Sequence, residues 1–99
     1  MEINYYTIDY NKNKYNEKDW NEYITAFIQK GEKVIEALQA YKGKVSDEIL
    51  IPIGCMLGSA SRLWLQRELE SIPGYTPLEL LKTEDGTKAL KAIIMRLNC

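Results

Sequence analysis

The sequence predicts an all-α protein, a small bundle of four or five helices with an extended N-terminal segment that can pair as a strand. Apolar residues recur at three- and four-residue steps over residues 19–42 and again over residues 84–97, the spacing of one helix face. Only residues 2–10 are rich in strand-favouring residue types, so no second segment offers a strand partner. With 99 residues, 45% of them hydrophobic, the chain is expected to form a single domain, residues 1–99, with one core.

Residues 1–18 are expected to form an extended arm followed by a polar loop. The segment EINYYTIDY, residues 2–10, carries apolar residues on both faces of an extended chain. It can drape over the helices, pair with a copy of itself in a homodimer, or add to the edge of a partner's sheet. The loop that follows alternates asparagine with lysine.

Residues 19–42 are predicted to form one long helix. Asp19, with Glu22 three residues later, resembles a capping box at its start. Its apolar stripe, which includes Trp20, Tyr23 and Phe27, is expected to be core. Gly31 lies on this stripe and predicts a close helix crossing, and Gly43 is expected to end the helix.

Residues 46–72 are predicted to form a helical region that Pro52 interrupts. Either a short turn ends before Pro52 and a new helix begins there, or one helix kinks at the proline. Gly54, Gly58 and Ser61 recur at three- and four-residue steps. Such small residues let two helix backbones approach, and we expect them to pack against Gly31.

Residues 73–99 carry two helix starts. Thr76, Pro77 and Glu79 form a capping box with proline at the first helical position. The chain then starts again at Thr83, and the two acidic residues after it suit the positive end of a helix dipole. This stretch therefore predicts a short helix, a tight corner and a longer final helix that reaches residue 97.

Composition argues against catalysis and predicts no metal or cofactor site. The sequence contains no histidine, which removes the commonest general base and metal ligand and excludes Ser-His-Asp and Cys-His mechanisms within the chain. Cys55 and Cys99 lack the spacing of a metal or redox pair. No apolar run reaches membrane-spanning length and the N-terminus does not resemble a secretory signal, so we expect a cytoplasmic protein without a membrane segment.

Without reactive groups, the chain is expected to act by binding another protein. Tyr75 is expected to be an exposed aromatic anchor, the basic residues of the final helix form a modest strip, and the last two residues can reach into a partner. The candidate partner-binding residues are Tyr75, Lys88, Lys91, Arg96, Asn98 and Cys99. With a net charge of −1 and no stacking aromatics beside the basic strip, nucleic acid is not the expected partner, and a small DNA-binding regulator is the weaker alternative.

The C-terminal part of the chain, about residues 60–97, resembles the toxin-binding domain of the Xre/MbcA/ParS group of bacterial antitoxins. The family pattern joins a Gly-rich turn, T-P-x-x-L-L, a threonine, a glycine and an aliphatic-basic-aliphatic helix end. The corresponding residues here are Gly74, Thr76, Pro77, Leu80, Leu81, Thr83, Gly86 and Met95-Arg96-Leu97, with Trp64-Leu65 upstream. The resemblance implies a domain that binds a toxin enzyme, often one that uses NAD, and occludes its active site.

The sequence also departs from that family. Residues 1–45 do not predict the two short helices of a helix-turn-helix, and Ile72-Pro73-Gly74-Tyr75 stands where the family has a glycine pair and a basic residue. Operator binding is therefore not implied for this chain. The alternative is a phage or mobile-element inhibitor of a bacterial defence protein, for example an anti-CRISPR protein.

Overall fold

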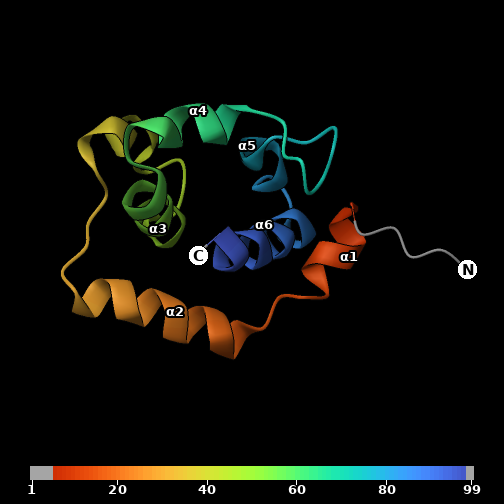
Figure 1. Ribbon diagram of the computed structural model, residues 1–99, viewed down its shortest axis with the longest axis horizontal. Helices are drawn as coiled ribbons and strands as arrows, with labels where there is room; N and C mark the ends of the chain where they lie inside the picture. Colours follow the sequence, from red (N-terminus) through yellow and green to blue (C-terminus); the bar gives the residue numbers. More distant parts are fainter. Residues whose placement is uncertain (1–5, 98–99) are drawn as a thin grey trace, which may run out of the picture.

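The computed structural model describes residues 6–97 and confirms the all-α fold. Figure 1 shows α6 in the middle of the molecule, with α2 below it, α4 and α5 above it, α3 to its left and α1 to its right. The helices are α1 (Ile8–Lys12), α2 (Glu17–Gln29), α3 (Asp47–Leu57), α4 (Ser61–Gln66), α5 (Pro77–Leu80) and α6 (Glu84–Leu97), with two 3₁₀ helices, η1 (Glu36–Tyr41) and η2 (Gly58–Ala60). Residues 6–97 contain no strand, only an isolated bridge between Lys42 and Val45.

The hydrophobic core is built around α6. Its residues Ala89, Leu90, Ile93 and Ile94 are buried, as expected for apolar positions that recur on one helix face. They pack with buried residues from the surrounding elements: Trp20, Ile24, Leu38, Val45, Ile49, Leu50, Ile53, Leu65, Leu69, Ile72 and Leu80. Residues from α2, η1, α3, α4 and α5 and from the connecting loops therefore form one core with α6.

The N-terminal segment is not extended where the structure describes it. The Thr7 hydroxyl accepts a hydrogen bond from the Tyr10 amide at 3.1 Å and caps α1, which begins at Ile8. The prediction of an extended arm over residues 2–10 is therefore wrong from Ile8 onward, while residues 2–5 lie outside the described part. The strand propensity of these residues is outweighed by the packing of α1 against α6, which favours the helical conformation.

The predicted helix over residues 19–42 is two elements. Asn16, rather than Asp19, caps α2 by accepting a hydrogen bond from the Asp19 amide at 3.0 Å. The helix ends in a Schellman motif, in which Gly31 adopts φ +77° and the Glu32 amide donates to the Phe27 carbonyl. Gly31 is thus a helix stop and not a crossing point, since no atom lies within 4 Å of a Cβ built there. Gly43, with φ +85°, does lie in the turn that follows η1.

The region predicted over residues 46–72 breaks at Gly58, not at Pro52. Helix α3 continues through Pro52, and the chain turns at Gly58 with φ +54° before η2 and α4. The helical region ends at Gln66, so residues 67–72 form a loop. Another segment does pack closely against Gly54, as predicted for a small residue. That segment is not Gly31 but the Ile35 side chain, which lies 3.0 Å from a Cβ built at Gly54.

The corner between α5 and α6 forms as predicted. Thr76 and Glu79 make both bonds of the capping box, each at 3.1 Å. The Thr83 hydroxyl accepts from the Gly86 amide at 2.9 Å, at the start of α6. A Cβ on Gly86 would lie 2.1 Å from the Leu80 carbonyl oxygen, so only glycine lets α6 begin this close to α5.

By length and composition alone, Asp47–Gln66 could cross a membrane, with a mean hydropathy of 1.2 in its most apolar window. This is weak evidence, because the core helix of a globular protein passes the same test. The turn at Gly58 divides this range, and Ile49, Leu50, Ile53 and Leu65 within it belong to the core.

We predict that Gly86→Ala destabilises the fold by about 3 kcal/mol, because the new methyl group meets backbone that cannot move without shifting a helix. Gly54→Ala is the matched control. Its methyl group meets only the Ile35 side chain, at 3.0–3.4 Å, which has to move by no more than a few tenths of an ångström, so stability should change by less than about 1 kcal/mol. Chemical denaturation of both variants measures the difference. Equal losses of stability in the two variants would contradict the close approach of α6 to α5 at Gly86.

A candidate docking face

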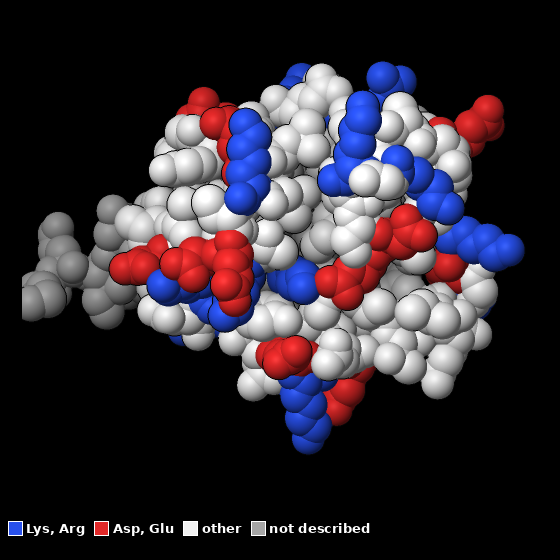
Figure 2. Space-filling view, turned by 180° about the vertical axis from the view of Figure 1, so that it is seen from behind, with Lys and Arg blue, Asp and Glu red and all other residues white. Residues whose placement is uncertain are grey.

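The basic residues of α6 do not form a free strip. Lys88 lies 3.7 Å from Glu84 one turn earlier, and Lys91 lies 2.8 Å from Glu48 on α3. Arg96 donates to the side-chain oxygen of Asn11 on α1. Figure 2 shows the same intermixing on the back of the molecule, where Lys and Arg side chains alternate with Asp and Glu. A surface of this kind offers little to a phosphate backbone.

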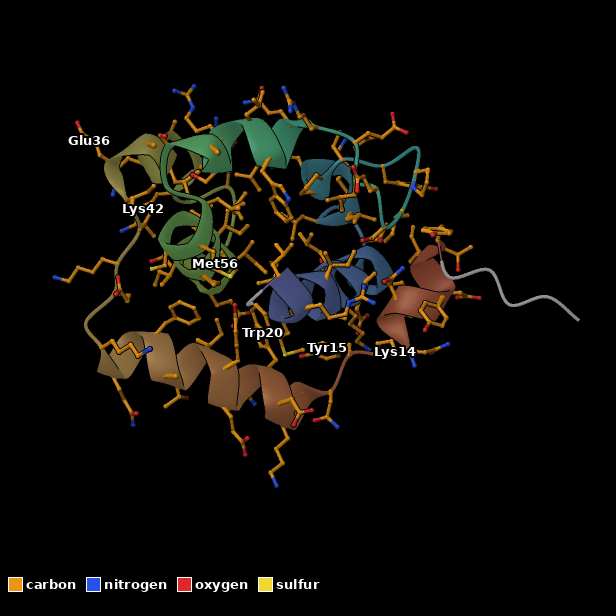
Figure 3. All side chains as sticks on the ribbon, in the orientation of Figure 1. Lys14, Tyr15, Trp20, Glu36, Lys42 and Met56 are labelled. Atoms are coloured by element: carbon orange, nitrogen blue, oxygen red, sulfur yellow. The ribbon has the colours of Figure 1, made fainter. Side chains whose placement is uncertain are left out.

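Lys91 is built into the protein. Its side chain is only 16% exposed, and its ammonium group lies 5.3 Å from the centre of the Trp20 ring and 5.7 Å from that of Tyr15. Figure 3 shows Tyr15 and Trp20 between α2 and α6. The ion pair with Glu48 adds α3 to the same contact. Lys91 therefore joins three elements, and its charge is used within the fold.

We expect Lys91→Met to lower the free energy of unfolding by about 1–2 kcal/mol, since it removes an ion pair and two cation–π contacts. Lys88→Met provides the control and should change it by less than about 0.5 kcal/mol, because its exposed pair with Glu84 is weak. Urea denaturation distinguishes them, and similar values for the two variants would contradict the role given to Lys91.

Tyr75 is held outward by a closed loop. The Leu69 amide donates to the Tyr75 carbonyl at 2.9 Å, and the Tyr75 amide donates to the Ile72 carbonyl at 3.2 Å. The Gly74 amide donates to the Glu68 carboxylate, and Gly74 itself takes φ +94°. Buried Leu69 and Ile72 fix this loop to the core, whereas the Tyr75 side chain stays 42% exposed. Little backbone entropy remains to be lost when Tyr75 binds.

Four shallow depressions adjoin one another through shared lining residues, and Tyr75 lines one of them. The first lies between Leu57, Leu63 and Arg67. The second is a groove of about 280 Å³ beside Ile93 and Leu97, and Trp64 and Arg67 line both. Ser71 lines both this groove and a third depression, at Arg96. Tyr6 lines both the depression at Arg96 and a fourth, wider depression at Tyr75. We call this joined surface the docking face.

Three of the four large hydrophobic residues that are most exposed in the described chain line the docking face: Tyr6 (61%), Leu63 (50%) and Tyr75 (42%). The sequence pattern predicts an exposed Tyr75 but does not point to Tyr6 or Leu63. The six-residue helix α4 contains Leu63, Trp64 and Leu65 in succession, and only Leu65 is fully buried. Three adjacent apolar residues cannot all face one side of a helix, and this signal could have identified Leu63.

Asn98 and Cys99 fall outside the described residues. No group of acidic residues and cysteines among residues 6–97 could hold a metal ion. Cys55, an exposed residue of α3, donates to the Glu32 carboxylate at 3.2 Å. Partial desolvation of its thiol, together with this carboxylate, raises the pKa of the thiol to about 11. A thiol in this state is a poor nucleophile.

In a Cys99→Ser background, Cys55 should react with iodoacetamide at pH 8 roughly 10- to 100-fold more slowly than in the unfolded chain, because its raised pKa leaves less thiolate. Glu32→Gln removes the carboxylate that accepts the thiol proton, lowers the pKa and speeds alkylation. The stability that the protonated thiol contributes is complete below its usual pKa of 9.0 and is lost as the pH rises through 11. Alkylation unaffected by Glu32→Gln would contradict the hydrogen bond.

Comparison of the chain with protein-family models, curated proteins and solved structures finds no match.

Proposed function

We propose that this chain is a non-catalytic inhibitor, an antitoxin-like domain that binds a toxin enzyme and occludes its active site. The observation that carries the proposal is the docking face, where exposed Tyr6, Leu63 and Tyr75 border joined depressions. Exposed apolar surface of this kind marks protein interaction sites. Tyrosine is also among the residues that contribute most to binding energy at interfaces.

The antitoxin class is favoured by the sequence of residues 60–97, whose pattern resembles the toxin-binding domain described above. In the structure, Thr76, Pro77, Thr83 and Gly86 shape the corner that carries α6, and the loop that presents Tyr75 ends directly at this corner. The docking face and the resembling residues therefore share one region. A binding role also agrees with a sequence that lacks histidine.

The proposal is tested with the product of the adjacent gene. Expression of that product alone should arrest growth, and co-expression of this chain should restore it. The purified pair should form a complex in which the enzyme loses activity. A neighbouring product that is harmless, or that stays active when this chain is in excess, would overturn the antitoxin proposal. Inhibition of a defence nuclease instead would place the chain with the anti-defence inhibitors.

Variants of the docking face should weaken this inhibition. Tyr75→Ala and Leu63→Asp should each reduce affinity for the enzyme by about 30-fold, the loss typical of an interface anchor. Ile28→Asp is the matched control, because Ile28 is 60% exposed on α2 and lies outside the four depressions. Calorimetry of the complex measures all three, and equal losses at Ile28 and Tyr75 would exclude this face.

A further inference from the structure

The depression at Arg96 is the polar part of the docking face. It has a volume of about 250 Å³ and lies where α1, the loop after α4 and the end of α6 meet. Among residues 6–97, every residue that lines it carries a hydrogen-bonding side chain: Tyr6, Tyr10, Asn11, Ser71 and Arg96. Arg96 is the one charged residue of this set. The neighbouring depressions, by contrast, contain apolar side chains such as Leu69, Ile72 and Ile93.

A buried amide holds Arg96 in place. Asn11 is completely buried, and its amide nitrogen donates to the Thr7 carbonyl at 2.8 Å and to the Ser71 carbonyl at 3.5 Å. These two bonds turn the Asn11 side-chain oxygen toward Arg96, whose Nη2 donates to it. The arginine head group is therefore oriented by the core of the fold and does not depend on a partner for its position.

The charge of Arg96 is not neutralised by a carboxylate in the described chain. Lys12 pairs with Asp85, Lys88 with Glu84 and Lys91 with Glu48, whereas Arg96 forms no ion pair within residues 6–97. Its bond to Asn11 uses one N–H of the five in a guanidinium group. The remaining N–H groups still offer a planar fork that fits the two oxygens of a carboxylate.

We propose that Arg96 binds a carboxylate of the protein partner, an Asp or Glu side chain that lies next to apolar side chains. This inference rests on the proposed function, since it assigns the chemistry of one part of the docking face. A single cation matches the single charge of a carboxylate, whereas a phosphate group, with nearly two charges, is typically held by several cations. Tyr6 and Ser71 each also line a neighbouring depression, so apolar partner residues can bind alongside.

The test uses a random linear peptide library displayed on phage and selected on the full chain. Enriched peptides should combine Asp or Glu with at least one aromatic or large aliphatic residue. Arg96→Gln should weaken binding of a synthetic copy by about tenfold or more, the loss expected for a charge-assisted pair. Replacing the Asp or Glu of the peptide by Asn or Gln should weaken binding by the same factor. Combining this peptide change with Arg96→Gln should weaken binding little further, because both changes remove the same ion pair.

Arg62→Gln is the matched control, because Arg62 is an exposed arginine on α4 outside the four depressions. The Arg62→Gln variant should bind the peptide with the affinity of the parent chain. Arg96→Lys keeps the charge but loses the fork, so it should recover only part of the affinity. Circular dichroism checks that each variant folds. The inference is overturned if no peptide is enriched, if enriched peptides lack acids, or if Arg96→Gln binds as tightly as Arg62→Gln.

The two proposals fail separately. If this chain inhibits the toxin and Arg96→Gln inhibits it with unchanged potency, the carboxylate site is wrong and the antitoxin role stands. If acidic peptides bind through Arg96 but no enzyme is inhibited, the antitoxin role is wrong and the carboxylate site stands.

Discussion

The close approach of Gly86 to the carbonyl of Leu80 is the constraint on which the rest of the structure depends. It lets α6 begin immediately behind α5 and directs the helix into the middle of the molecule. There, the buried stripe of α6 supplies the surface on which the other helices pack. A side chain at position 86 would force α5 and α6 apart, and the loop that presents Tyr75 would move with α5, because it ends at the Thr76 cap.

The edge of α6 illustrates how one helix serves both stability and binding. Lys91 and Arg96 are both basic and lie on the same helix, but their surroundings give them different roles. Lys91 contacts two aromatic rings and Glu48, so its charge is used to join α2 and α3 to α6. Arg96 contacts an amide oxygen, which fixes its direction and leaves its charge available.

The docking face combines these features. The backbone of Tyr75 is held by hydrogen bonds within the loop over residues 67–75, and Arg96 is held by the buried amide of Asn11. Both residues are positioned by the fold itself, without a partner. Such preorganisation reduces the entropy lost on association, which suits an inhibitor built from a small domain.

The sequence by itself determined the all-α class, the capping box at Thr76, the corner at Thr83 and the helix that ends at Leu97, because hydrophobic periodicity and capping are local properties. It missed α1 and misplaced the end of α2 and the break at Gly58, where strand propensity, a glycine on the apolar stripe and a proline gave misleading local signals. It identified Tyr75 and the basic residues of α6 as candidates but could not separate Lys91 from Arg96. Only the tertiary structure decided that, because Glu48 and Asn11, the residues that engage these two charges, are 43 and 85 positions away in the chain.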